Sequence, residues 1–235
     1  MKALQTATLS FVMIAVAATQ ALAGGSITGK VLFDGEPPNR RQVKMDADPA
    51  CAQANPEPRL GEVMVISANK EIANTFVYIK DGLSGEFDVP AEAAQLDQNG
   101  CMYSPHVLGV MVGQTLEIKN SDATLHNVHS LPKNSKQFNN AMPLKDSTIK
   151  KKFTSEEVMV RMKCDVHPWM SAYIGVLSHP FHAVSSEDGT FTIEGLPAGT
   201  YTVAAWHERL GTQEASVTVA DGAAATADFT FAPSK

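Results

Sequence analysis

The chain has 235 residues and a formal net charge of −6 at pH 7. This acidic balance gives no reason to expect nucleic acid as a partner. Beyond the first 23 residues, no apolar run reaches the length of a membrane-spanning helix, so we expect no membrane span.

Residues 1–23 have the features of a secretory signal peptide. Lys2 provides a positive start, Leu9 to Ala17 form a short apolar run, and Ala21 to Ala23 resemble a cleavage site. The apolar run is too short to cross a bilayer. We therefore expect cleavage near Ala23 and a periplasmic or secreted product.

The rest of the sequence favours strands over helices. Short alternating or β-branched runs are separated by turn residues, and they lie at Ser26–Phe33, Thr75–Lys80, Thr115–Lys119, Glu157–Lys163, Gly189–Ile193 and Tyr201–Ala205. Only Pro90 to Gln95 suggest a helical turn. The pattern predicts an all-β chain that is long enough for two small sandwiches.

The segment from Cys164 to Met170 carries the clearest chemical signal. It places Cys164, His167 and Met170 at Cys-x-x-His-x-x-Met spacing. A thiolate, an imidazole and a thioether together suit copper better than zinc, magnesium or calcium. A trigonal copper site needs one more imidazole, and two histidines lie upstream, His126 and His129. They are three residues apart, so they point to opposite faces of a strand, and only one of them can face the metal.

These two segments resemble the copper-binding stretches of the cupredoxins, or blue copper proteins. Residues 120–131 and 158–176 are most similar to those of the amicyanins, in which Pro also follows the second ligand histidine and Met lies three residues beyond it. The family pattern places the first ligand in a His-Asn pair, which selects His126 rather than His129. The resemblance therefore implies one type 1 copper per chain, with the ligands His126, Cys164, His167 and Met170.

The same resemblance implies roles for residues around the copper. Asn127 is expected to join the two ligand segments by side-chain hydrogen bonds. Pro168 and Trp169 lie between the last two ligands, so they either form an apolar docking surface for a redox partner or, in the case of Trp169, belong to the core. The family has no ligand at the position of His106, and its distance from the metal stays open.

The cysteine count is consistent with a copper thiolate. Three cysteines are an odd number for an exported chain. If Cys164 stays a thiolate for the metal, Cys51 and Cys101 are left to pair in an oxidising compartment. We therefore expect a disulfide between them.

The C-terminal region carries a second resemblance. Glu187 to Val203 are similar to carboxypeptidase regulatory-like domains, which have a transthyretin-like β-sandwich, and Gly29 to Pro38 resemble the opening of that family. The resemblances together predict an all-β fold in which a Greek-key cupredoxin sandwich, residues 89–179, is inserted in a split accessory sandwich, residues 24–88 plus 180–235. The alternative is two domains in series, and contacts between Val31 and Val203 would distinguish the two arrangements.

These features predict an exported one-electron carrier rather than an enzyme. Its partner would be a redox protein such as a dehydrogenase or a c-type cytochrome. Two alternatives stay open: a copper-handling protein, which the ten methionines keep in view, and a non-redox binding module with a vestigial site.

Overall fold

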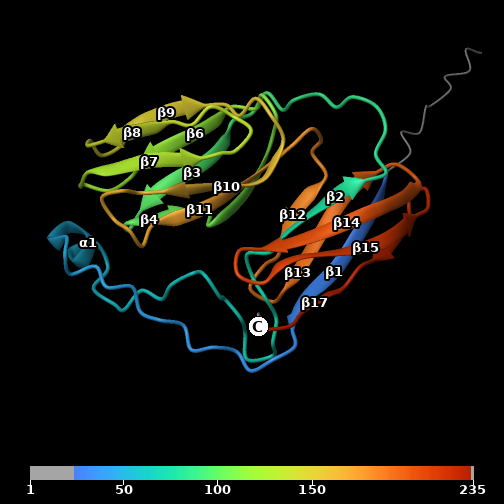
Figure 1. The fold of residues 1–235 in the computed structure, drawn as a ribbon, viewed down its shortest axis with the longest axis horizontal. Helices are drawn as coiled ribbons and strands as arrows, with labels where there is room; N and C mark the ends of the chain where they lie inside the picture. Colours follow the sequence, from blue (N-terminus) through green and yellow to red (C-terminus); the bar gives the residue numbers. More distant parts are fainter. Residues whose placement is uncertain (1–23, 234–235) are drawn as a thin grey trace, which may run out of the picture.

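The computed structural model describes residues 24–233, so the predicted signal peptide lies outside the described residues. Within this range the chain forms seventeen strands and one short helix, α1 (Pro49–Ala54). The prediction of an all-β fold is confirmed. Figure 1 shows two sandwiches side by side, joined by long connections. The described residues include no helix that is long and apolar enough to cross a membrane.

The first sandwich contains the segments that resemble the copper-binding stretches. One of its sheets has the order β5 (Val107–Met111), β11 (Ser171–Leu177), β10 (Glu157–Lys163), β7 (His126–Leu131) and β8 (Asn139–Met142). The other has the order β4 (Met102–Ser104), β3 (Ala94–Asn99), β6 (Leu116–Asn120) and β9 (Thr148–Lys151). Apolar side chains from both sheets form one buried core, which includes Leu96, Ile118, Val128 and Ile174.

The second sandwich combines the two ends of the described chain. One sheet has the order β13 (Thr190–Leu196), β1 (Gly25–Phe33) and β16 (Ala224–Thr226), and β17 (Phe229–Phe231) also pairs with β1. The other has the order β12 (His182–Val184), β2 (Phe76–Asp81), β14 (Gly199–His207) and β15 (Gly211–Val219). Val31 and Val203 lie in the same buried core.

Residue alternation explains why this second sandwich forms. In β13 the buried side chains are Phe191, Ile193 and Leu196, and their neighbours are exposed. Successive side chains of a strand point to opposite faces, so Phe191 and Ile193 share one apolar face. The pairing with β1 shifts register between Ile193 and Leu196, which interrupts the alternation before Leu196. Gly195 has φ of +76°, a conformation that an L-residue rarely adopts, and β14 begins four residues later.

We propose the inserted arrangement on the basis of these two cores, with residues 89–179 between the halves of the accessory sandwich. One segment departs from the predicted boundaries. Met45 and Cys51 lie in the core of the first sandwich, although they belong to the predicted accessory range 24–88. The chain between β1 and β2 therefore reaches across and contributes α1 to the other sandwich (Figure 1).

Six strands predicted from the sequence are present as β1, β2, β6, β10, β13 and β14. The prediction of a helical turn around Pro90 to Gln95 is wrong, because these residues form bends and then the start of β3. Strand β3 pairs in parallel with β6, and Leu96 is buried between the sheets. Tertiary pairing therefore determines the conformation of a segment whose local pattern is ambiguous.

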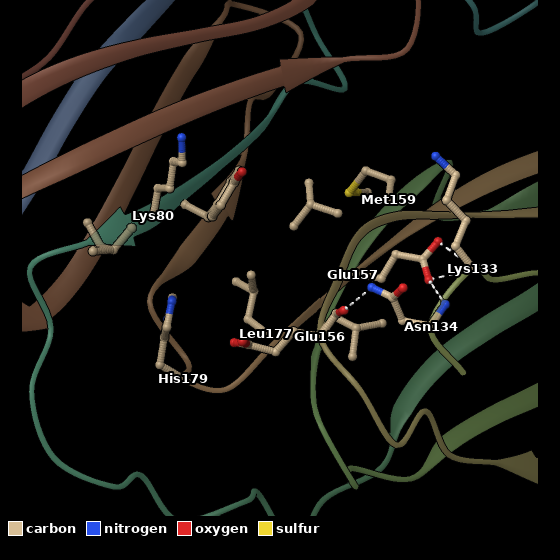
Figure 2. A pocket seen from close by; sticks show the side chains of 12 residues that line it. Lys80, Lys133, Asn134, Glu156, Glu157, Met159, Leu177 and His179 are labelled. Atoms are coloured by element: carbon tan, nitrogen blue, oxygen red, sulfur yellow. Dashed lines mark hydrogen bonds between the residues drawn. The ribbon is translucent and has the colours of Figure 1, made fainter. Parts of the chain in front are cut away.

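The two sandwiches contact each other through a smaller apolar cluster of Phe76, Val107 and Leu177. A cleft of about 380 Å³ near this contact is lined by residues of both sandwiches (Figure 2). One of the carboxylates that line it, Glu157, accepts hydrogen bonds from the backbone N–H groups of Lys133 and Asn134, at 2.7 and 2.9 Å. This carboxylate thus ties the loop between β7 and β8 to the start of β10.

A histidine at this contact makes the fold sensitive to acid. His182 packs on Phe76, with 5.3 Å between the ring centroids. The other side of its ring lies directly against Gly109, where an added Cβ would be 2.0 Å from the His182 Nε2 atom. Burial, followed by the charge of His179, lowers the pKa of His182 to about 4. The ring is therefore neutral in the folded protein over a pH range in which an unfolded chain takes up a proton.

We expect the free energy of unfolding to fall as the pH drops from about 6.5 to 4, because the unfolded state binds the proton first. His182→Gln should reduce this loss by up to about 3 kcal/mol, since glutamine does not titrate. Urea denaturation of the metal-free protein at pH 7 and pH 4.5 measures the effect. A variant with the same pH dependence as the wild type would contradict this assignment.

Candidate metal centre

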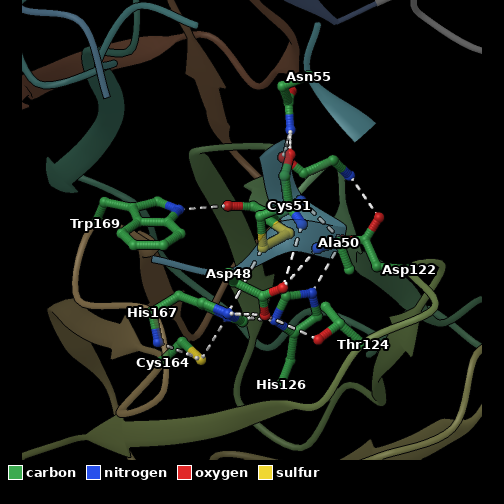
Figure 3. Close-up of a disulfide and its surroundings, with 12 residues drawn as sticks. Asp48, Ala50, Cys51, Asn55, Asp122, Thr124, His126, Cys164, His167 and Trp169 are labelled. Carbon is green, nitrogen blue, oxygen red and sulfur yellow. Dashed lines mark hydrogen bonds and ion pairs between the residues drawn. A yellow bond between two sulfur atoms is a disulfide. The ribbon is translucent and has the colours of Figure 1, made fainter. Parts of the chain in front are cut away.

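Three side chains converge at one end of the first sandwich (Figure 3). The ligand atoms of His126, Cys164 and His167 all lie within 4.8 Å of one another. His126 Nδ1 is 2.9 Å from His167 Nδ1, and Cys164 Sγ is 3.9 Å from His167 Nδ1. All three side chains are at most 2% exposed. The structure thus brings together three of the four residues that the sequence proposes as copper ligands.

Two strands and one short loop determine these positions. His126 begins β7, where it pairs with Met142 of β8, and Cys164 directly follows β10. The loop after Cys164 closes on itself, because Met170 donates its N–H to the His167 carbonyl at 2.9 Å and accepts from the Cys164 N–H at 3.3 Å. Met170, the fourth proposed ligand, is fully buried at the end of this loop.

The far edge of each imidazole is occupied by a carboxylate. His126 Nε2 lies 2.9 Å from Asp122 Oδ2, and His167 Nε2 lies 2.9 Å from Asp48 Oδ2. Burial raises the pKa of Asp122, but the hydrogen bonds that it accepts from His126 and from the backbone N–H groups of Cys101 and Gly100 outweigh burial and lower it. An ionised carboxylate only accepts hydrogen bonds, so each Nε2 carries a proton and Nδ1 is the ring nitrogen that can bind a metal.

The two Nδ1 atoms therefore face each other across the centre. Two lone pairs at 2.9 Å repel unless a proton or a metal ion lies between them. Burial by itself would lower the pKa of His126, but the hydrogen bonds with Asp122 and Cys164 raise it to about 9. In the metal-free protein the centre thus favours a positive charge at the position where both imidazoles and the thiol meet.

The cysteine at the centre is prepared to act as a thiolate. Burial raises the pKa of the Cys164 thiol, but the hydrogen bonds from His126 and from backbone N–H groups outweigh burial and lower it. The N–H groups of Asn127 and His167 lie 3.5 and 3.4 Å from the sulfur. A thiolate and two neutral imidazoles form a donor set that suits copper, and hydrogen bonds to the sulfur influence the potential of such a site.

Asn127 joins the two ligand segments. Its Oδ1 accepts from the Asp165 N–H at 2.6 Å, and Cys164 Sγ lies 3.3 Å from the same oxygen. Its Nδ2 donates to Asn139 Oδ1 and to Asp165 Oδ2. Tyr103 adds a second link, because its hydroxyl donates to the carbonyls of Asn127 and Lys163 at 2.8 and 3.1 Å.

The predicted disulfide is present, and it lies against the centre. Cys51 of α1 is bonded to Cys101, and Cys51 Sγ is 3.6 Å from His167 Nε2 (Figure 3). Closing a loop of this length stabilises the fold by about 4 kcal/mol in the chain-entropy model. Trp169 covers another side of the His167 ring at a centroid distance of 5.0 Å, and its indole N–H donates to the Cys101 carbonyl at 3.0 Å.

The other histidines considered as ligands lie away from this group. His129 contacts Asp165 Oδ2 at 2.9 Å and also Gln137, so it contributes to the network behind Asn127. His106 Nε2 lies 2.5 Å from Glu208 Oε1 of the second sandwich. Pro168 is exposed and Trp169 is half-buried, so only Pro168 is freely accessible among the two residues proposed for docking.

Asp48 and Asp122 are the site residues that the sequence analysis missed. Asp122 lies four residues before His126, a proximity that is visible in the sequence. Asp48 precedes Pro49 and so marks a helix start, but its contact with His167 spans 119 residues. Nothing in the local sequence indicates that contact.

Comparisons with known proteins give two kinds of similarity. Residues 168–232 match the family model of the carboxypeptidase regulatory-like domain. A purple cupredoxin from Nitrosopumilus maritimus is 28% identical over 35% of this chain and 98% of its own length, with a TM-score of 0.30. An oxidised amicyanin variant is 23% identical over 43% of this chain and 97% of its own length, with a TM-score of 0.33.

A copper-containing nitrite reductase from Thermus scotoductus SA-01 is 20% identical over 40% of this chain, with a TM-score of 0.34. This chain covers only 24% of the reductase. Comparison with curated proteins gives no match. Both families that the sequence motifs resemble are thus found among these similarities.

The geometry of the centre predicts different effects for the two histidines of β7. His126→Ala should lower the Cu(II) affinity at least about 100-fold, because it removes a donor atom and leaves Asp122 without its partner. By comparison, the loss of a residue that only hydrogen-bonds to a metal ligand costs about 10–100-fold. His129→Ala is the matched control and should cost less than tenfold. Competition titration with a chelator measures both. Equal losses would show that the wrong histidine has been assigned.

Proposed function

We propose that this protein is an exported type 1 copper protein that carries single electrons between redox partners. The observation that supports this most strongly is the convergence of one thiol and two imidazole Nδ1 atoms in a buried group. That donor set, with a weak axial thioether, is typical of blue-copper electron-transfer sites. Copper bound here would supply the one-electron couple between Cu(II) and Cu(I).

The residues of the chain would keep the geometry the same in both oxidation states. His126 begins β7, Cys164 directly follows β10, and these two strands pair with each other. The carboxylates of Asp122 and Asp48 fix the orientation of the two imidazoles. Asn127 connects the two segments, so the distances between donor atoms depend on packed elements rather than on a mobile loop. Small rearrangement on reduction is what fast electron transfer requires.

We propose Met170 as the axial ligand. It is fully buried, and its backbone hydrogen bonds to His167 and Cys164 keep it beside both residues in the loop. Its thioether sulfur would be a weak fourth donor to copper held by His126, Cys164 and His167, and it would influence the reduction potential. With this position filled and the donors buried, no open position is implied for a substrate, which favours a carrier over an enzyme.

Electrons would enter or leave near the ligand loop. The exposed apolar residues Leu125 and Val166 each lie next to a ligand histidine in the sequence, and Pro168 is exposed after His167. Accessible apolar side chains of this kind favour contact with another protein. We propose a redox protein, such as a dehydrogenase or a c-type cytochrome, as the partner.

The disulfide supports an oxidising compartment such as the periplasm. Structural disulfides persist there and are rare in the cytosol. The same disulfide connects α1 to the first sandwich next to His167, so it adds a covalent constraint on that side of the centre. Retention of copper is therefore favoured over its delivery to another protein.

Reversible reduction tests the proposed function. The copper-loaded protein should show an intense visible band from the Cys164 thiolate, lose it on reduction by a small mediator and regain it on oxidation, with one copper retained through repeated cycles. Cys164→Ser should lack the band, because a hydroxyl is not a thiolate donor. Metal loss in each cycle would favour copper handling, and a protein without copper affinity would favour a vestigial site.

A further inference from the structure

Asp48 reaches the metal centre from outside the strands that carry the ligands. It lies in the connection between β1 and β2, just before α1, and its carboxylate is shared between two tasks. Oδ1 accepts the N–H groups of Ala50 and Cys51 at 2.8 and 3.4 Å, which caps the helix. Oδ2 accepts from His167 Nε2 at 2.9 Å and from the Thr124 hydroxyl at 3.0 Å (Figure 3).

The segment that carries Asp48 is firmly attached to the first sandwich. Met45 is buried in its core, and the Cys51–Cys101 disulfide follows three residues after Asp48. The Asn55 amide donates to the Gly100 carbonyl at 2.9 Å and also to the Cys51 carbonyl. The segment around the carboxylate is therefore fixed by a buried apolar side chain before Asp48 and by covalent and polar contacts after it.

We propose that Asp48 is a positioning residue for the copper centre, which orients His167 and stabilises the oxidised state of the metal. This inference rests on the proposed function. A histidine ligand that donates its second N–H to a carboxylate has a fixed ring orientation and a more basic donor nitrogen. The Asp48 side chain is 22% exposed, but the His167 ring that it contacts is only 2% exposed, so its negative charge would act on bound copper across a ring that is shielded from water.

The charge favours Cu(II) over Cu(I), because the ion with the higher charge gains more from a nearby carboxylate. Asp122 has the corresponding contact with His126, but it comes from the loop just before β7. Asp48 therefore differs in origin: a segment outside the ligand-bearing strands contributes directly to the properties of the metal. The connection between β1 and β2 thus influences the reduction potential of the metal in addition to joining two strands.

Asp48→Asn separates this role from helix capping. Asparagine caps a helix as well as aspartate does, so α1 and the disulfide should be retained. The amide has no charge and is a weaker acceptor for the His167 N–H. Asp46→Asn is the matched control, because Asp46 is exposed in the same segment and the substitution is chemically identical.

Affinities for Cu(II) and Cu(I), measured by competition titration, and the reduction potential test the proposal. In Asp48→Asn the Cu(II) affinity should fall 10–100-fold, with a smaller loss for Cu(I), and each tenfold difference between the two losses raises the potential by about 59 mV. In the metal-free protein, the ¹⁵N resonance of His167 Nε2 should also shift. Asp46→Asn should match the wild type in all of these measurements.

Each outcome decides the question. A folded Asp48→Asn protein with an intact disulfide, an unchanged potential and an unchanged His167 resonance would show that Asp48 only caps α1, and the proposal would be overturned while the proposed function stands. A wild-type protein that binds no copper would overturn both. A variant that loses the disulfide or α1, detected by peptide mapping and circular dichroism, would contradict the separation of the two roles.

Discussion

The arrangement of this structure depends on two buried imidazole rings, those of His126 and His167. Both nitrogen atoms of each ring are removed from water. A buried polar atom without a partner is costly, so all four nitrogens need one. Asp48 and Asp122 satisfy the two Nε2 atoms, which leaves the two Nδ1 atoms 2.9 Å apart and beside the Cys164 sulfur. A metal ion at that point would satisfy all three donors at once, whereas a proton satisfies only the two nitrogens.

This constraint gives a reason for the path of the chain. The connection between β1 and β2 leaves its own sandwich, places α1 against the first one and is fixed there by the Cys51–Cys101 disulfide. Without this excursion, the outer edge of His167 would lack the carboxylate of Asp48. The disulfide and the indole of Trp169, which are packed against the same ring, complete the cover. Fold and site are thus coupled through a long and mostly irregular connection, residues 34–75.

Much of the fold and most of the ligand group could be predicted from the sequence, because both depend on local patterns. Alternating residues identified strands such as β1 and β13, and the spacing from Cys164 to Met170 fits one closed loop. Asp48 could not be found in this way, because its contact with His167 depends on how a distant helix packs. The start of β3 was misjudged for a similar reason, since its parallel partner β6 lies beyond a turn and two other strands.

The central claim is that one thiolate and two imidazoles bind a single copper ion in both of its oxidation states. X-ray absorption at the copper edge, measured on the oxidised and the reduced protein, tests this most directly. The account predicts one short bond to sulfur and two bonds to imidazole nitrogen, with nearly the same distances in both states. A first shell of nitrogen and oxygen alone, or the loss of one imidazole on reduction at neutral pH, would contradict it.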